Sequence, residues 1–421
     1  MERLPGFRDF YPEPLPAKDA WSADLRDYLF GAWRAVVGSY GFHEYDGPPL
    51  EPTGLFTKKS GDEIVGQLYN FQDKGEREVS LRPEMTPTLA RMAAAGERSY
   101  KKPFKWFSIP QLFRYERTQK GRLREHFQLN CDIVGEAGPS ADAEMVALLI
   151  DLLRKLNLTA EDFVIRLSSR NAWQAFFEER CEDVDKAYEF YQIIDKLERE
   201  DPAETDKKLS TLGFSGNEVR DFITAGKPTD ELQFIMDDLT ARGLGEFVKI
   251  DYGIIRGLAY YTGPVFEAFD RKGEFRAIAG GGRYDHLIKL ISDGKVDLPA
   301  LGFGMGDVVL TELLKARNLA PDASSSLDVF VLIEDPGLRA DSLRLIQQLR
   351  ENQHTVDYAL PDMKANKQFK RANELGAEFT ARTEGNVVVI KHLKTRQEVR
   401  VPADEASKTI LEWVPEKPAD K

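Results

Sequence analysis

The chain has 421 residues, of which 42% are hydrophobic, and this length predicts two or three domains rather than one. The formal net charge of −12 argues against a general coat of basic charge for nucleic acid, so a polyanionic partner would have to meet local basic patches. No apolar run reaches the roughly 18 residues of a membrane helix, and we expect no membrane association.

The two cysteines, Cys131 and Cys181, are too few for a disulfide framework. Their scarcity fits a reducing compartment, so we expect a cytoplasmic location. Five scattered histidines add no zinc-binding pattern. These residue types therefore indicate neither a secreted disulfide-rich protein nor a zinc protein.

The first predicted element is an amphipathic helix over residues 17–40. Its apolar residues recur at helical spacing: Trp21, Leu25, Leu29 and Trp33. From about 43 to 136 the pattern changes to short β-type runs such as "LYNFQD" and "EVSLRPE", and residues 140–156 are helical again. Residues 170–245 are charged and rich in helical periodicity, which predicts a helical insertion.

Glycine-rich strands follow the insertion, and the stretch "LAPDASSS" then marks a linker, which we place at 321–327. Alternating strand and helix patterns over 328–414 predict a small α/β domain. The charged residues at 415–421 predict a flexible tail. The sequence thus predicts one large domain over 1–320 and a smaller one after it.

A basic loop runs into an alternating strand between Phe113 and Glu136. Four basic residues fall within eight positions: Arg117, Lys120, Arg122 and Arg124. Period-two alternation predicts one apolar face: Phe127, Leu129, Cys131 and Ile133. It predicts an opposite, polar face: His126, Gln128, Asn130 and Asp132.

Arg114 and Glu116 share one face of the preceding strand, so the two strands and the loop predict a hairpin with a polar floor. Planar guanidinium groups grip phosphate oxygens in a bidentate way, and a polyphosphate would fit across such a floor. A second interpretation stays open from the residues alone. Arginine-rich hairpins are also common on ordinary surfaces, and half-buried strands alternate too.

Four motifs in order resemble the histidyl-tRNA synthetase family. The segment "FRYER…GRLREHFQ" resembles the second signature motif of class II aminoacyl-tRNA synthetases, and "LRPEMTP" (81–87) resembles a strand of this family. "RGLAYYT" (256–262) and "GGGRYD" (280–285) resemble two further segments, and Pro48 matches the proline of the dimer-forming first motif. The resemblance extends from residue 5 to about 413.

The resemblance implies an α+β fold, in which a class II synthetase core with a mostly antiparallel sheet flanked by helices carries the helical insertion and a C-terminal α/β anticodon-binding domain. It also implies a homodimer. The implied activity is histidine–tRNA ligation, in which histidine and ATP give histidyl-adenylate and histidine then passes to tRNA(His). Mg²⁺ is implied beside ATP, but the sequence identifies no metal ligands.

The resemblance implies site residues one by one. Arg114 and Arg256 would act on the α-phosphate of ATP. Other parts of ATP would be contacted by Glu116, near the adenine and ribose, by Arg122, near the phosphates, and by His126, at the adenine. The residues implied for histidine binding are Glu84, Thr86, Gln128, Asp132, Tyr260 and Tyr261. A stripe of basic residues in the C-terminal domain would contact tRNA phosphates, or else form a solvated helix face: Lys364, Lys367, Lys370 and Arg371.

Three positions depart from the family pattern. Val309 stands where the third class II motif has an arginine, and Asp132 stands where the family more often has glutamate. His126 occupies the place of the phenylalanine that stacks on adenine, with Phe127 next to it. Alternation puts His126 on the polar face, so we expect His126 to be the stacking residue.

Two other function classes stay open. One is a catalytically inactive relative, such as the regulatory subunit of ATP phosphoribosyltransferase, and the absent motif-three arginine at Val309 is its main support. The other is a general nucleic-acid-binding protein, which the net charge of −12 disfavours. Amino-acid-dependent ATP turnover would distinguish both from a synthetase.

Overall fold

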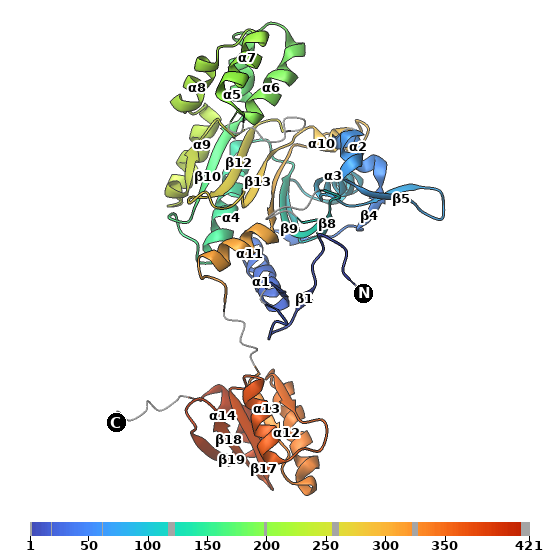
Figure 1. Ribbon diagram of the computed structural model, residues 1–421, viewed down its shortest axis with the longest axis vertical. Helices are drawn as coiled ribbons and strands as arrows, with labels where there is room; N and C mark the ends of the chain where they lie inside the picture. Colours follow the sequence, from blue (N-terminus) through green and yellow to red (C-terminus); the bar gives the residue numbers. More distant parts are fainter. Residues whose placement is uncertain are drawn as a thin grey trace. The chain divides into compact units, whose positions relative to one another are not determined.

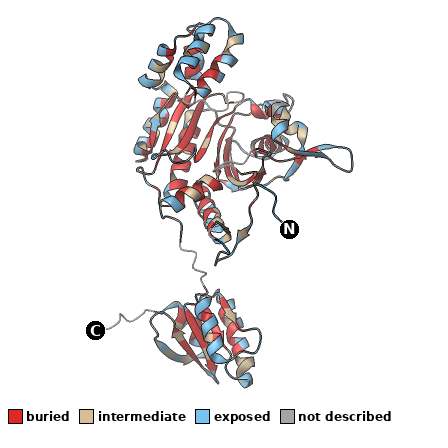
Figure 2. Cartoon of the chain, in the orientation of Figure 1, coloured by how far each residue is buried: buried red, intermediate tan, exposed pale blue. Residues whose placement is uncertain are grey.

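The chain forms two compact units, Met1–Pro321 and Asp322–Lys421 (Figure 1). The computed structural model describes the following residues: 2–17, 19–60, 62–116, 123–197, 200–254, 261–321 and 327–413. Most of the linker predicted at 321–327, and the tail predicted at 415–421, lie outside these ranges. Buried residues concentrate on the strands and on the inner faces of the helices in each unit (Figure 2).

The centre of the first unit is a sheet of nine strands within the described residues. Its order along the sheet is β11 (Val248–Ile250), β10 (Phe163–Ser169), β12 (Pro264–Asp270), β13 (Ala279–Arg283), β14 (Ala300–Gly306), β9 (Glu125–Val134), β7 (Phe104–Ser108) and β3 (His43–Glu44), with β8 (Gln111–Phe113) paired to β9. Only the β10–β11 and β3–β7 pairs among these described strands are parallel. The mostly antiparallel sheet with helices confirms the predicted fold class.

Helices α1 (Ala23–Ser39), α4 (Pro139–Arg154) and α11 (Asp307–Ala316) contribute to the main core. Buried side chains of α4 such as Leu149 meet Leu129, Cys131 and Ile133 of β9 in one apolar cluster. This cluster holds the apolar face of β9, so the opposite face of the strand is left for polar residues.

The helix predicted over 17–40 begins later than the pattern indicated. Ser22 caps α1, because its hydroxyl accepts a hydrogen bond from the backbone N–H of Leu25 at 3.1 Å. Trp21 is therefore not helical. It forms the short strand β2 (Trp21–Ser22), which pairs with β1 (Phe10–Tyr11) near the start of the chain.

Residues 43–136 are less purely β than predicted. They contain helices α2 (Thr53–Ser60) and α3 (Thr86–Ala95) beside a three-stranded sheet in the order β4 (Leu50–Pro52), β6 (Glu78–Leu81) and β5 (Tyr69–Gln72). Pro87 lies in the first turn of α3, where proline suits a helix, and Leu89 is buried in a second core cluster. The proline is thus a helix start rather than a strand breaker.

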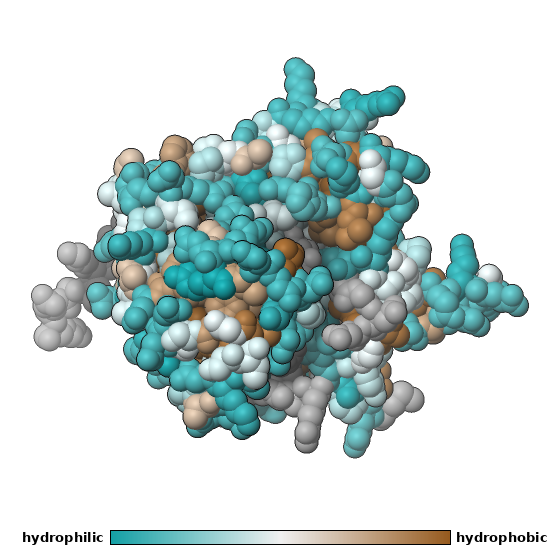
Figure 3. Space-filling model, turned by 90° about the horizontal axis from the view of Figure 1, so that it is seen from above, coloured by the Kyte–Doolittle hydropathy of each residue, from teal (hydrophilic) through white to brown (hydrophobic). Residues whose placement is uncertain are grey.

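The predicted insertion is helical, as expected. Its helices are α5 (Arg170–Glu178), α6 (Ala187–Lys196), α7 (Pro202–Leu212), α8 (Gly216–Ala225) and α9 (Asp230–Ala241). Phe176, Phe190 and Phe214 pack their rings together inside it, with the closest centroids, those of Phe190 and Phe214, 4.4 Å apart. The face at the insertion end is mostly hydrophilic, with hydrophobic side chains in separate patches (Figure 3).

Within residues 327–413 the second unit forms a five-stranded sheet with helices on both faces. The strand order is β16 (Val356–Tyr358), β15 (Val329–Leu332), β17 (Phe379–Glu384), β18 (Val387–His392) and β19 (Glu398–Pro402). Val329 of β15 packs in the cluster of α12 (Arg339–Glu351) and α14 (Ala406–Leu411), whereas Phe330 packs in that of α13 (Ala365–Glu374). Among the described helices of the whole chain, none is long and apolar enough to cross a membrane.

Candidate active site

The polar face of β9 forms the floor of the site. Leu129, Cys131 and Ile133 are buried in the main core, as the alternation predicted. Gln128 and Asp132, on the other face, line a cavity of about 150 Å³. We call it the polar cavity, and its lining residues are Glu84, Thr86, Arg114, Gln128, Asn130, Asp132, Tyr261, Gly280, Tyr284, Gly302, Phe303 and Gly304.

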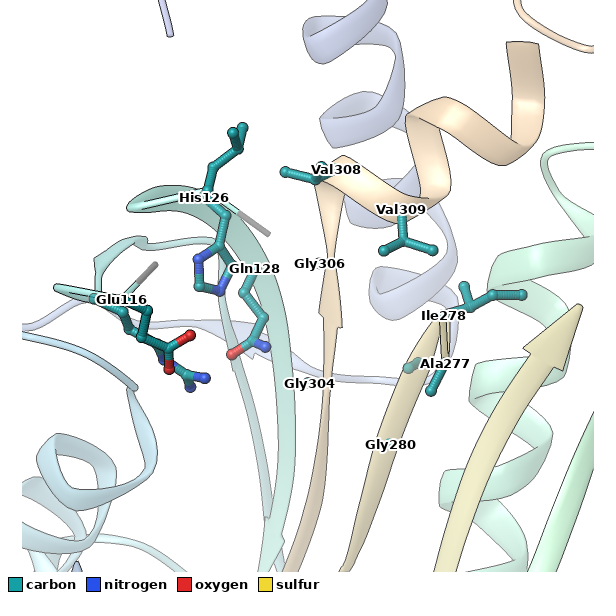
Figure 4. A pocket seen from close by; sticks show the side chains of 13 residues that line it. Glu116, His126, Gln128, Ala277, Ile278, Gly280, Gly304, Gly306, Val308 and Val309 are labelled. Atoms are coloured by element: carbon teal, nitrogen blue, oxygen red, sulfur yellow. The ribbon is translucent and has the colours of Figure 1, made fainter. Parts of the chain in front are cut away.

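A second cavity, of about 180 Å³, adjoins the first. We call it the valine-lined cavity, and its lining residues are Arg114, Glu116, Leu123, His126, Gln128, Ala277, Ile278, Ala279, Gly280, Gly304, Gly306, Val308 and Val309 (Figure 4). Arg114 and Gln128 belong to both cavities, as do Gly280 and Gly304. The two cavities therefore meet at Arg114 and Gln128.

The predicted hairpin positions Arg114 at this meeting point. Strand β8 pairs antiparallel with β9, and the backbone N–H of Arg114 donates to the carbonyl of Arg124 at 2.9 Å. The Nε of Arg114 donates to the carbonyl of Pro83, also at 2.9 Å, which fixes the plane of the guanidinium. Arg122, predicted to contact ATP, lies outside the described residues.

Glycines on the neighbouring strands leave room above the polar floor. A Cβ on Gly302 would lie 2.0 Å from a carboxylate oxygen of Asp132, and a Cβ on Gly304 would lie 2.8 Å from the Gln128 side chain. The glycines of the motif "GGGRYD", Gly280–Gly282, lie within β13. In β14, "LGFGMG" alternates core residues with glycines, a period-two signal for a floor without side chains.

Asp132 is held by a residue to which the sequence assigned no role. Tyr284, the tyrosine of "GGGRYD", donates its hydroxyl hydrogen bond to the carboxylate of Asp132. Burial raises the pKa of Asp132 to about 7, although this hydrogen bond and the charge of Lys59 act against the rise. The motif itself was the available signal for Tyr284, since its tyrosine directly follows the glycine-rich strand.

Glu84 and Thr86 also line the polar cavity. The ammonium of Lys59 donates to a Glu84 carboxylate oxygen at 2.5 Å, and the Lys59 side chain is only 3% exposed. The pattern "TKKSG" gave no sign of this contact, because it depends on how α2 packs near the start of α3. Tyr261 also lines the cavity, whereas its predicted neighbour Tyr260 lies outside the described residues.

The two aromatic rings at the start of β9 face opposite ways. His126 lines the valine-lined cavity, and Figure 4 shows its ring on the same side as Gln128. Burial, followed by the charges of Arg114 and Arg8, lowers the pKa of His126 to about 3, so the ring is neutral. Phe127 instead packs edge-on against Phe30, with ring centroids 5.2 Å apart.

The far wall of the valine-lined cavity is apolar. Val309, Ile278 and Ala277 lie across the cavity from His126 in Figure 4. Val309 follows two residues after the start of α11, which begins directly at the end of β14. Arg256, predicted as the second phosphate-binding arginine, lies outside the described residues.

The described residues hold no group of three or more His, Cys, Asp or Glu side chains that could bind a metal ion. Glu116 is the acidic residue among those that line the valine-lined cavity. Mg²⁺ commonly uses one or two carboxylates together with substrate phosphates and water. This donor set therefore suits a magnesium ion that arrives with a polyphosphate rather than one held by the protein alone.

The basic stripe of the second unit is exposed along α13. Its members are Lys364, Lys367, Lys370 and Arg371. Lys370 lies 3.6 Å from Glu374, a contact between two exposed side chains that contributes little to stability. The stripe thus presents positive charge at the surface of the unit.

Comparison with known proteins identifies relatives over the whole chain. A family model for histidyl-tRNA synthetase matches residues 15–307, and one for an anticodon binding domain matches 328–413. A histidine–tRNA ligase of Opitutus terrae is 41% identical and covers 98% of each chain.

Solved structures give the same fold. The histidyl-tRNA synthetase of a Nostoc species matches with a TM-score of 0.78 at 24% identity, covering 95% of this chain and 97% of that one. A Bacillus halodurans protein described as an ATP phosphoribosyltransferase regulatory subunit/histidyl-tRNA synthetase matches at 0.73 and 19% identity, covering 91% and 98%. At these identities the structural matches show the fold alone.

Proposed function

The chain belongs to the histidyl-tRNA synthetase family, and from this premise we propose how its two adjoining cavities ligate histidine to tRNA(His). The first half-reaction joins histidine and ATP into histidyl-adenylate and releases pyrophosphate. The second passes the histidyl group to the 3′ end of the tRNA. The observation that carries the assignment is the meeting of a polar and an apolar-walled cavity at one guanidinium, that of Arg114.

Histidine occupies the polar cavity in this proposal. Its ammonium group lies at Glu84 and Thr86, and its imidazole ring lies between Asp132 and Tyr261. Tyr260, outside the described residues, is assigned to histidine binding by family resemblance alone. A neutral imidazole offers one donor and one acceptor, which polar groups can complement. A site that needs such partners rejects apolar analogues by about 10⁴–10⁵ without a separate editing site.

ATP occupies the valine-lined cavity. The neutral ring of His126 stacks on adenine, Val309 supplies an apolar wall, and Glu116 lies toward the nucleoside. The His126 ring and the Val309 side chain are both uncharged, so neither has to gain or lose a proton when a base binds. A neutral His126 ring also avoids repulsion with the Arg114 guanidinium. Figure 4 shows the space between these two walls.

Arg114 acts where the two substrates meet. Attack of the histidine carboxylate on the α-phosphorus is an in-line displacement, and negative charge grows on the non-bridging oxygens. The guanidinium of Arg114, already oriented by the Pro83 carbonyl, stabilises this charge. Arg122 and Arg256 are assigned the neighbouring phosphate contacts by family resemblance. Glu116 would help to hold a magnesium ion that accompanies ATP, and such an ion would supply positive charge for the phosphates.

The C-terminal unit binds tRNA in this proposal. Its family model is that of an anticodon binding domain, and the stripe on α13 supplies charge for phosphates. Lys367→Ala is expected to weaken tRNA binding and to lower the slope of log affinity against log salt by about 1. Lys408→Ala, an exposed lysine on α14, is the control and leaves both unchanged.

We also propose a cytoplasmic homodimer. Leu50 of β4 and Phe71 of β5 are 38% and 50% exposed, which suits coverage by a second subunit. Both cysteines are free thiols, as a reducing compartment requires. Sedimentation velocity decides the oligomeric state, and a monomer at micromolar concentration would contradict the dimer.

Aminoacylation tests the complete function. The chain is incubated with ATP, Mg²⁺, radiolabelled histidine and a tRNA(His) transcript, with a non-cognate tRNA as control. Label that becomes acid-precipitable only with tRNA(His) is expected. The alternative, an inactive relative such as the ATP phosphoribosyltransferase regulatory subunit, predicts no labelled tRNA. A general nucleic-acid-binding protein also predicts no label, and in a binding titration it predicts equal affinity for the cognate and the non-cognate tRNA.

A further inference from the structure

Arg8 lies at the centre of a buried ion network behind the valine-lined cavity. Its guanidinium donates to both oxygens of Glu125, with Nε 2.6 Å from Oε1, and to both oxygens of Asp307, with one terminal nitrogen 2.8 Å from Oδ2. No more than 3% of any of these three side chains is exposed. One planar guanidinium thus makes two hydrogen bonds to each of two buried carboxyl groups, which the compact ammonium group of a lysine could not do.

The network connects three segments that are distant in the sequence. Arg8 precedes β1, Glu125 begins β9, and Asp307 begins α11. Asp307 also accepts a hydrogen bond from the backbone N–H of Phe127 at 3.0 Å. The Trp21 ring lies 4.5 Å from the guanidinium carbon and covers the network.

Each carboxylate of the network adjoins a residue that lines the cavity. His126 lies between Glu125 and Phe127, so the backbone is held on both sides of the His126 ring. Val309 lies in the first turn of α11, two residues after Asp307. The two facing walls of the cavity are therefore tied to one side chain.

We propose that Arg8 is a positioning residue for ATP, which fixes the spacing between the His126 wall and the Val309 wall. This inference rests on the proposed function, in which ATP occupies the valine-lined cavity. Asp132 and Tyr284, which are hydrogen-bonded to each other, line the polar cavity and do not line the valine-lined cavity. Loss of the paired hydrogen bonds of the Arg8 guanidinium therefore weakens ATP binding much more than histidine binding.

The test compares Arg8→Lys with a matched control in the full chain. Lysine keeps the positive charge between the carboxylates but cannot make the paired hydrogen bonds of the guanidinium to each of them. The control is Arg317→Lys, since the Arg317 guanidinium also donates hydrogen bonds to two carboxylates, Asp270 at 2.5 Å and Glu274 at 3.0 Å, and lies 3.5 Å from a third, Asp162. The Arg317 side chain is 8% exposed and lines neither cavity.

Calorimetry measures the Kd of ATP and of histidine separately, and pyrophosphate exchange gives the two KM values. Arg8→Lys is expected to raise the Kd and KM for ATP roughly 10- to 100-fold, the loss that a misplacement of about 1 Å can cause. The values for histidine stay within about twofold, and Arg317→Lys changes neither substrate by more than about twofold.

Asp307→Asn provides a second variant if Arg8→Lys does not fold. Asparagine can still accept from the Phe127 N–H but loses the ion pair, so the Kd for ATP rises while that for histidine stays within about twofold. If both variants fold, the double variant should weaken ATP binding by less than the product of the single effects, because both act on one contact.

An unchanged ATP Kd in a folded variant, or equal losses for ATP and histidine, overturns the positioning role and leaves the proposed function intact. A wild-type chain that binds ATP without any exchange contradicts the proposed function, while the Kd comparison still decides the role of Arg8. A wild-type chain that does not bind ATP overturns both.

Discussion

The hydroxyl of Tyr284 donates a hydrogen bond to the carboxylate of Asp132 and so links the residue after β13 to the C-terminal part of β9. Both side chains are buried, and both line the polar cavity. A carboxylate has about four acceptor positions, so Asp132 can also accept a hydrogen bond from an imidazole N–H. The tyrosine thereby orients the group that distinguishes histidine.

Removing the Tyr284 hydroxyl should weaken the binding of histidine but not that of ATP. Tyr284→Phe is expected to raise the KM for histidine roughly 10- to 100-fold, because a hydrogen bond to a charged group contributes about 1.5–3 kcal/mol. The KM for ATP should stay within about twofold, since Tyr284 does not line the valine-lined cavity. Pyrophosphate exchange measures both values, and an equal rise in the two would argue against a histidine-specific role.

The titration of Asp132 should appear in the stability of the protein without substrate. Burial raises the pKa of Asp132 to about 7 in the folded chain, whereas an unfolded aspartate titrates near 3.9. Between these values the folded state binds one more proton, so this group's contribution is fully present below about pH 4 and is lost as the pH rises toward 7.

Asp132→Asn removes that titration. The free energy of unfolding of the variant, minus that of the wild type, should therefore increase between about pH 4 and 7, by at most about 1.4 kcal/mol per pH unit. Urea denaturation at several pH values measures the difference, and contributions of other groups such as Asp142 cancel in it. A difference that does not change with pH would contradict the shifted pKa.

Alanine substitutions at the three glycines of β14 should cause losses of activity of graded size. An added Cβ would lie 2.0 Å from Asp132 at Gly302, 2.8 Å from Gln128 at Gly304, and 3.9 Å from the His126 ring at Gly306. The loss of kcat/KM for histidine on substitution by alanine should therefore decrease in that order. Gly302→Ala should lose about 100-fold or more, since it displaces the carboxylate. A Gly306→Ala variant as impaired as Gly302→Ala would contradict the account.

Alanine substitutions at His126 and Phe127 should change different quantities, ATP binding in the first case and the stability of the fold in the second. His126→Ala is expected to raise the KM for ATP roughly tenfold, within the 1–3 kcal/mol that stacking on a base contributes. Phe127→Ala should instead lower the free energy of unfolding by about 2–3 kcal/mol, less than the 3–5 of a fully buried phenylalanine. Thermal denaturation and exchange kinetics together measure both, and the reverse assignment would mean that Phe127 faces the nucleotide.

The sequence predicted what depends on local periodicity. Alternation along β9 separated Leu129 from Gln128, and the hairpin that carries Arg114 followed from it. Contacts between distant segments were not predictable in this way. Arg8 meets Asp307 across 299 positions, and the partner of Tyr284 depends on the register of β13, β14 and β9. Helix α3 was missed because residues 43–136 were interpreted as short β-type runs and "LRPEMTP" was assigned to a strand.

The most direct test of the central claim is ATP–pyrophosphate exchange with each of the twenty amino acids, with Arg114→Ala as the control. Removal of one donor to the developing charge commonly costs about 10²–10³ in rate. The account predicts exchange with histidine alone, reduced by that factor in the variant. A folded wild-type chain without exchange, or one equally active with another amino acid, would contradict it.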